Sequence, residues 1–293
     1  MKDFWWIMFI VTAALLSACE RTSSRTNVTT GQNRYGGGAI GFSGAAKQDG
    51  RLIEGNRSSY ITHGIEGSVE SSPRISQPSE TAAMGRLARK IRPFLDVDAV
   101  VTDVGSIKVF VTRELVPILG DCFLGGHPMA GSERSGLEAA RWDLFLQAPC
   151  ILTPLGPAHH PAVISRLEKV RDLWDSAGAR IFEMTPEQHD TAVAFVSHLP
   201  HVTAAALVST ICSQPPSLQE IAGGGYRDAT RIAQGAADLW LDVLLENREA
   251  ILAALSHYDD QLRTLSHLLK MSDTEGLYNF LEKASVARSL LKN

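Results

Sequence analysis

The hydrophobic pattern of the chain changes near Thr185, and this change constrains the fold more than any other feature. Before it, apolar runs with the length and composition of strands occur in the segments 98–108, 121–131, 148–155 and 179–184, with a helical stretch over 162–178. Strands and helices in alternation favour a mainly parallel α/β sheet. After it, apolar residues recur at helical spacing, which predicts an all-helical second part.

The pattern divides the chain into three segments. Residues 1–77 are atypical, because from Glu20 onwards they are polar and contain no apolar run long enough for a buried strand, a composition that predicts a linker or a disordered segment. Residues 78–185 are expected to form most of an α/β domain, which begins with a helical stretch over 80–95. Residues 186–293 are expected to form a helical domain. An apolar stripe there is wide enough for packing on more than one side, including across a dimer: Leu241, Leu244, Leu245, Ile251 and Leu255.

Composition excludes some classes of function. The 293 residues suffice for two domains, and the formal net charge of -4 argues against a general nucleic-acid binder, which needs clustered Lys and Arg. The four cysteines lie far apart and have neither metal-ligand spacing nor the density of a secreted disulfide scaffold. Free thiols in a reducing compartment are therefore expected, and no metal site.

The N-terminus points to a different compartment. An apolar run from Phe4 to Leu16 is followed by Ser17, Ala18 and Cys19, which resembles the lipobox of a bacterial lipoprotein signal. The run is too short to span a bilayer as a helix. The residues alone leave two interpretations open: a membrane-anchored lipoprotein, or an apolar start that arises by chance.

Two polar residues follow predicted strands at the edge where an open parallel sheet binds ligands. Ser106 comes after AVVTDVG, and His127 comes after CFLGG. On neighbouring strands their side chains would face one crevice, and the glycines before His127 would let a ligand approach the backbone. The alternative is a histidine that only makes structural hydrogen bonds.

The helical part contains two further candidate groups. In SHLPH, Ser197 and His201 would share a helix face, and Pro200 would bend that helix open. In GGGYRDATRIA, Arg227 and Arg231 are also four residues apart, which suits carboxylate recognition near a glycine-rich turn. The alternative for the arginines is a surface helix with salt bridges.

The motifs VVTDVGSIK, GGHPMAGSERSG, SHLPH and GGGYRDATRIA, followed by LWLDVLLENREAIL, occur in an order and spacing that resembles the prephenate/arogenate dehydrogenase family. The resemblance extends from about Pro78 to the C-terminus. It implies an α/β Rossmann-like domain, then an all-α dimerisation domain and a homodimer through the C-terminal helices. It also implies oxidative decarboxylation of prephenate, or of its amino analogue arogenate, with NAD or NADP.

The resemblance also implies roles for individual residues. His127 matches the catalytic histidine that accepts the substrate hydroxyl proton, and Ser106 matches a serine that orients the same hydroxyl. Arg231 matches the arginine that binds a substrate carboxylate, with His201 and Ser197 at binding positions nearby. Trp240 is expected in the core or in the wall of the cleft. Further residues expected to line the pocket are Ser132, Glu133 and Lys108.

The sequence departs from the family where a nucleotide-binding domain should begin. The only candidate for the glycine-rich turn is GGGAIG, which supplies Gly36, Gly38 and Gly41, and no buried strand precedes it. Where an acidic residue for the ribose is expected, the chain has Asn56 and Arg57, a pairing that favours NADP. We hypothesise that this segment comes from a wrong reading frame or a wrong start.

Three interpretations of the whole chain follow. The first is a cytoplasmic dehydrogenase, with the lipobox an accident of translation. The second is an inactive remnant that keeps the helical dimer and a substrate pocket but does not hold the cofactor. The third is a lipoprotein anchored through Cys19.

Overall fold

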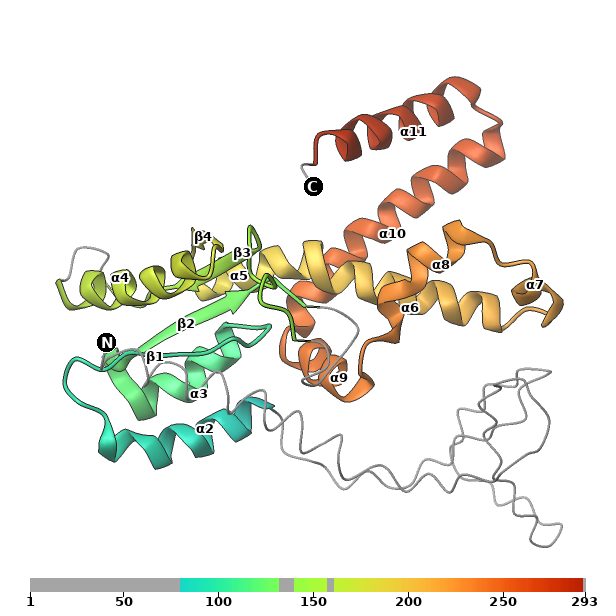
Figure 1. The fold of residues 1–293 in the computed structure, drawn as a ribbon. Coiled ribbons are helices and arrows are strands. Elements are labelled where there is room, and N and C mark those ends of the chain that lie inside the picture. The colour runs from blue at the N-terminus through green and yellow to red at the C-terminus, as the bar shows by residue number, and fades with distance from the viewer. Residues whose placement is uncertain (1–79, 132–139, 157–160, 292–293) are drawn as a thin grey trace, which may run out of the picture.

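The computed structural model of the chain describes residues 80–131, 140–156 and 161–291. An α/β part and a helical part lie next to each other, and the second half of α10 (Arg248–Met271) projects away from both together with α11 (Thr274–Ser289) (Figure 1). The glycine-rich turn, the ribose-site residues and the lipobox predicted from the sequence lie outside the described residues.

The sheet has four strands in the order β1-β2-β3-β4. Its strands are β1 (Val101–Thr102), β2 (Phe123–Pro128), β3 (Pro149–Thr153) and β4 (Arg180–Glu183). β1 pairs with β2 and β3 with β4 in parallel, but β2 pairs with β3 antiparallel, with His127 opposite Ile151. The sheet is thus mixed, where the sequence predicted a mainly parallel one. The described residues between β2 and β3 contain turns and no crossover helix of the kind that usually joins parallel strands.

Helices cover both faces of this sheet (Figure 1). They are α2 (Glu80–Ile91), α3 (Val109–Leu119) and α4 (Pro161–Ser176), with short 3-10 turns η1 (Arg92–Phe94) and η2 (Gly120–Cys122). Phe123 packs with α2 and α3, whereas the next residue, Leu124, packs with Val170 and Trp174 of α4. Successive side chains of a strand point to opposite faces, so β2 has a hydrophobic core on each side.

After Thr185 every described element is helical, as the sequence predicted. The elements are α5 (Pro186–Val193), the π-helical turn η4 (Ala194–His198), α6 (Leu199–Cys212), α7 (Ser217–Glu220), α8 (Gly224–Thr230), the 3-10 turn η5 (Arg231–Gln234), α9 (Ala237–Glu246), α10 (Arg248–Met271) and α11 (Thr274–Ser289). The first helix starts at a capping box. The Thr185 hydroxyl accepts a hydrogen bond from the Gln188 backbone N–H, and the Gln188 side-chain oxygen Oε1 accepts one from the Thr185 backbone N–H.

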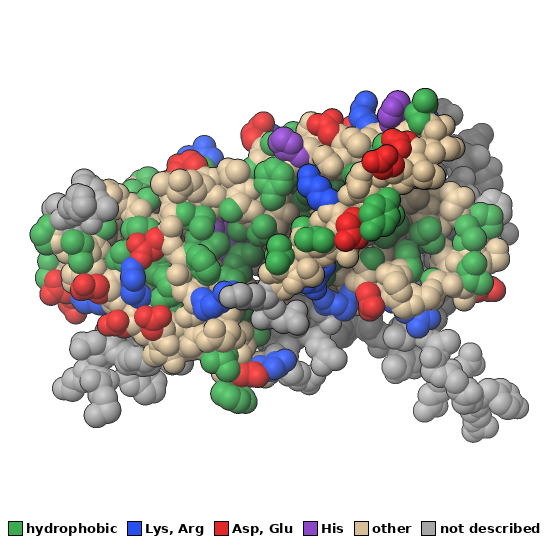
Figure 2. Space-filling model, turned by 90° about the horizontal axis from the view of Figure 1, so that it is seen from above, with side chains coloured by type: hydrophobic (Ala, Val, Ile, Leu, Met, Phe, Trp, Pro, Cys, Tyr) green, Lys and Arg blue, Asp and Glu red, His purple; other side chains and the backbone are tan. Residues whose placement is uncertain are grey.

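α10 and α11 form a hairpin that packs little against the rest of the described chain. Only Ile251 and Ala254 are buried in α10, and no residue of α11 is buried. Large hydrophobic side chains, among them Leu269 and Leu281, are exposed there. In the view from above, hydrophobic side chains lie among charged ones over the helical part (Figure 2). Such a hairpin is expected to bury its apolar residues against another chain.

An 18-residue window of the continuous helical run Pro186–Cys212 has a mean hydropathy of 1.4, and the run meets the length and composition of a membrane-crossing helix. The core helix of a soluble protein meets the same criterion. This run places four buried polar side chains, His189, Asp190, His198 and His201, in contact with other described residues. These contacts tie the run to the rest of the described fold, although only 28% of the window is buried within it.

Candidate functional site

His127 lies in β2, a strand whose six residues are all buried, and its side chain is 8% exposed. The glycines before it serve a different purpose from the one the sequence suggested. A Cβ on Gly126 would lie 2.9 Å from the Asp103 carbonyl oxygen, and one on Gly125 would overlap the Thr153 hydroxyl. Protein atoms of the neighbouring strands fill this space, so the glycines allow the strands to pack closely rather than making room for a ligand.

A buried ion pair holds the loop between β1 and α3. The Lys108 ammonium donates to Asp103 Oδ2, and the side chains are 0% and 4% exposed. The same oxygen accepts the Gly105 N–H at 2.8 Å, and Oδ1 accepts the Gly126 N–H at 3.0 Å. Asp103 therefore fixes the loop that carries Ser106, which is partly buried, against the strand that carries His127. Lys108 was expected to line the pocket, but its ammonium lies in the interior and is bound to Asp103.

The imidazole of His127 is linked to two residues of the helical part. His127 Nδ1 and His189 Nε2 are 2.8 Å apart, and His189 Nδ1 lies 2.7 Å from Asp190 Oδ1. Burial lowers the pKa of His127 well below its ordinary value of 6.5, and Lys108, His189 and His198 lower it further. The imidazole is therefore neutral near pH 7.

Asp190 also connects the helical part to α3. Its Oδ1 accepts the Lys108 N–H at 2.7 Å, and its Oδ2 accepts the Val109 N–H at 2.9 Å. These are unpaired donors at the start of a helix, so a carboxylate of α5 caps a helix of the α/β part. The position of His189 thus depends on both parts of the chain.

Two further buried residues, Asn247 and His198, lie beside Asp190. The side-chain amide of Asn247 donates to the Asp190 carbonyl oxygen at 2.8 Å and lies 3.2 Å from His198 Nδ1. Burial lowers the pKa of His198 to about 4, although Asp190 raises it. Like His127, His198 is therefore neutral near pH 7.

His201 and Trp240 form a stacked pair, with ring centroids 3.5 Å apart and planes 6° apart. Gly235 leaves room for them, because a Cβ there would lie 2.5 Å from Trp240 Nε1 and 3.1 Å from His201 Cε1. Burial lowers the pKa of His201, and a hydrogen bond to the Ile232 backbone opposes this. Trp240 also meets His198 edge to face, at 6.0 Å between centroids. Aromatic contacts therefore connect His201 to the group around His127.

The segment SHLPH is helical, but its geometry differs from the expected helix face. Ser197 and His198 lie in the π-helical turn, and His201 lies in the α-helix that follows. Pro200 has no N–H to donate to the preceding turn, which is consistent with a wider turn at this point. Ser197 is partly buried, and His201 is 7% exposed.

The arginine pair is split between two elements. Arg227 lies in α8, whereas Arg231 begins η5 and precedes the residue whose backbone contacts His201. Both arginines are exposed. Arg231 therefore adjoins in sequence the residue that bonds His201. Ser132 and Glu133 lie outside the described residues.

Sequence reasoning missed His189, Asp190, His198, Asn247 and Asp103. The His-Asp pair directly after a capping signal, TPEQHD, was the available indication, because polar residues inside a mostly apolar helix call for partners. Nothing in the spacing showed that these partners belong to the other part of the chain.

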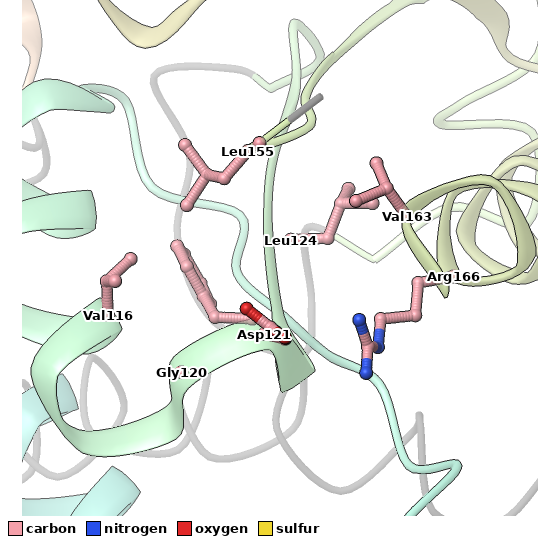
Figure 3. A pocket seen from close by; sticks show the side chains of 9 residues that line it. Val116, Gly120, Asp121, Leu124, Leu155, Val163 and Arg166 are labelled. Atoms are coloured by element: carbon pink, nitrogen blue, oxygen red, sulfur yellow. The ribbon is translucent and has the colours of Figure 1, made fainter. Parts of the chain in front are cut away.

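A separate hollow lies at the other end of β2. It is lined by the start of that strand and by α3 and α4, and it includes Asp121 and Arg166 (Figure 3). Phe123 and Leu124 border it, whereas His127 lies near the opposite end of the strand. The hollow is therefore distinct from the histidine cluster.

A sheet with helices on both faces, joined to a helical part that completes a histidine cluster at the end of a strand, defines a two-part protein whose α/β part resembles a nucleotide-binding domain. Comparison with known families agrees. Residues 75–183 match the nucleotide-binding domain of prephenate dehydrogenase, and residues 185–283 match its dimerisation domain. The chain belongs to the prephenate dehydrogenase family, which confirms the predicted family and its two-part fold.

Individual relatives are similar over most of the chain. Cyclohexadienyl dehydrogenase of Zymomonas mobilis is 34% identical, with 81% of each sequence covered. The structure of prephenate dehydrogenase from Aquifex aeolicus in complex with hydroxyphenyl propionate and NAD+ is 36% identical, with a TM-score of 0.66 over 71% of this chain and 73% of that one. Synechocystis arogenate dehydrogenase is 31% identical, with a TM-score of 0.61 over 70% and 73%.

The described residues fit the reacting end of a nicotinamide nucleotide. In an open α/β sheet such a ligand lies beyond the carboxyl ends of the strands. There His127 is slightly exposed, and its Nε2 has no hydrogen-bond partner among the described residues. The loop with Ser106 follows the neighbouring strand β1. Predicted contacts to the phosphates and ribose, from Gly36 to Arg57, lie outside the described residues.

Proposed function

We propose that the chain oxidises prephenate, with loss of carbon dioxide, to 4-hydroxyphenylpyruvate. The observation that carries the proposal is the neutral imidazole of His127, with one nitrogen bound to His189 and the other unbonded within the described chain. NAD or NADP, when bound, supplies the carbon that accepts the hydride. The complex of the Aquifex aeolicus relative with NAD+ and a hydroxyphenyl compound supports this assignment.

The protein residues accept one proton from the substrate and later return it. His127 Nε2 accepts the proton of the ring hydroxyl as the hydride leaves the same carbon, and Ser106 orients that hydroxyl. The dienone that results is a vinylogous β-keto acid, so the ring carboxylate leaves as carbon dioxide and the ring becomes a phenolate. His127 returns its proton to the phenolate oxygen. The low pKa of His127 favours this return, since its protonated form is a strong acid.

The substrate is a dianion and needs positive charge. We assign one carboxylate to Arg231, because a guanidinium makes bidentate bonds to carboxylates and this residue directly precedes Ile232, whose backbone bonds His201. Ser197 and His201 hydrogen-bond the substrate nearby. Lys108 acts indirectly, through the loop that it holds with Asp103. Ser132 and Glu133 remain candidates for the pocket wall.

A coupled assay that follows NADH and NADPH with prephenate and with arogenate tests the function. We expect turnover of prephenate, and loss of about 100-fold or more in kcat for His127→Asn, which lacks the Nε2 position. His267→Asn, on the exposed face of α10, is the matched control and should keep wild-type kcat. A His127→Asn variant with full turnover would contradict the catalytic assignment.

Two alternatives have specific support. Arogenate as the substrate is favoured by the similarity to the Synechocystis enzyme, and the same assay decides between the two compounds. A cofactor-deficient remnant is favoured by the poor surroundings of GGGAIG. Fluorescence titration of the purified chain with NADH and NADPH distinguishes it, since the remnant should not bind either.

We further propose that the chain acts in the cytoplasm, where prephenate and nicotinamide nucleotides occur. We also propose that it forms a homodimer through α10 and α11, whose apolar side chains are exposed in the described chain. Metabolic labelling with a radioactive fatty acid tests the alternative of an anchor at Cys19. Incorporation that is lost in Cys19→Ser would contradict a cytoplasmic enzyme.

A further inference from the structure

We propose that His189 and Asp190 are positioning residues that hold His127 in the tautomer with hydrogen on Nδ1, so that Nε2 is the proton acceptor. The inference rests on the proposed function of His127, but its main test does not require substrate. His127, His189 and Asp190 form a chain of hydrogen bonds that runs from β2 to α5.

The donors and acceptors are assigned starting from Asp190, because both of its carboxyl oxygens act as acceptors. Oδ1 accepts the Lys108 N–H and Oδ2 accepts the Val109 N–H at the start of α3. His189 Nδ1 lies 2.7 Å from Oδ1 and must therefore carry a hydrogen. In a neutral imidazole the other nitrogen, Nε2, is then an acceptor.

With Nε2 of a neutral His189 as the acceptor, His127 Nδ1, 2.8 Å away, is the donor and carries the hydrogen. The lone pair of neutral His127 is thereby left on Nε2, the nitrogen without a partner in the described chain. An imidazole without this constraint can carry its hydrogen on either nitrogen, and the form with hydrogen on Nε2 cannot accept a proton there.

Neighbouring residues hold this relay, the hydrogen-bonded chain of Asp190, His189 and His127, in place. Asn247 of the α9–α10 junction donates to the carbonyl oxygen of Asp190, and His189 is 0% exposed. Water therefore does not replace either bond readily, and the geometry does not depend on exposed side chains. None of these residues is needed to contact the substrate.

Nitrogen-15 NMR of the intact protein with labelled histidine tests the tautomer directly. At pH 7 we expect His127, assigned by the signals lost in His127→Asn, to show a protonated Nδ1 and an unprotonated Nε2. In His189→Leu the pattern should become mixed or reversed, because the acceptor is gone. A reversed pattern in the wild-type protein would overturn the proposal, whether or not any variant folds.

Kinetics provide the second test. His189→Leu should lower kcat by about 100-fold with KM nearly unchanged, since His189 does not touch the substrate. His189→Gln places an amide oxygen near the former Nε2 and should restore kcat to within about tenfold of wild type. Equal losses in both variants, with wild-type nitrogen signals for His127, would refute the positioning role.

The two tests distinguish this inference from the proposed function. If no tested compound is turned over but the nitrogen signals are as expected, the proposed reaction fails while the relay stands. If prephenate is turned over and the signals are reversed, the relay fails while the reaction stands.

Discussion

Replacing Asp103 by alanine tests whether the buried ion pair holds the loop before α3. The substitution leaves the Lys108 ammonium, which is 0% exposed, without its counter-charge. Removal of one partner from a buried pair costs about 3–5 kcal/mol. It also leaves the Gly105 and Gly126 N–H groups without their acceptor, at about 1–3 kcal/mol for each group that water does not reach. Because domains are stable by about 5–15 kcal/mol, Asp103→Ala should remove a third or more of the stability.

Equilibrium unfolding in urea, followed by far-UV circular dichroism, measures the effect. Asp103→Asn with Lys108→Met removes both charges and keeps one acceptor oxygen, so the double variant should be more stable than Asp103→Asn alone by about 2 kcal/mol or more. Asp143→Ala, in the exposed pair with Arg141, is the matched control and should change stability little. The reasoning is refuted if the double variant is no more stable than Asp103→Asn.

Three further outcomes are expected. His198 takes up its proton near pH 6.5 in the unfolded chain and near pH 4 in the folded chain. The free energy of unfolding in urea should therefore fall by roughly 2–3 kcal/mol as the pH drops from above 6.5 to 4, and His198→Gln should flatten this dependence on pH. Gly235→Ala should displace the stack on Trp240 and cost about 1–3 kcal/mol, with a shift in tryptophan emission; unchanged emission and stability would contradict the packing. Leu269→Glu with Leu281→Glu should convert the dimer to monomer in light scattering, and a variant that stays dimeric would place the interface elsewhere.

The local elements were largely predictable because each depends on short-range pattern. The runs in 121–131 and 148–155 contain β2 and β3, and the helical stretch 162–178 contains all of α4 except its first residue. The antiparallel pairing of β2 with β3 was not predictable, since strand direction depends on the path of the connection and not on the composition of the strands. Close packing beside Gly125 and Gly126 was missed for a similar reason, because it depends on residues of neighbouring strands.

Single residues of the candidate site were predictable from the sequence, but the contacts between them were not. His127 and Arg231 stand in motifs that a sequence shows directly. His189 and Asp190 were overlooked because a histidine and an aspartate at the start of a helix are common on protein surfaces, and only the fold shows that they are buried against α3. The charge that was expected to face the substrate at Lys108 is instead neutralised within the α/β part.

The bonds from Asp190 to the first N–H groups of α3 limit how the molecule can open. A hinge rotation at the junction near Thr185 would break two hydrogen bonds to a charged group, each worth roughly 1.5–3 kcal/mol, and would leave the carboxylate bare in a closed space. The two bonds therefore oppose independent motion of α3 and α5. We expect entry and exit of a reactant to displace peripheral segments, while the bonded frame around the proton-accepting nitrogen stays closed.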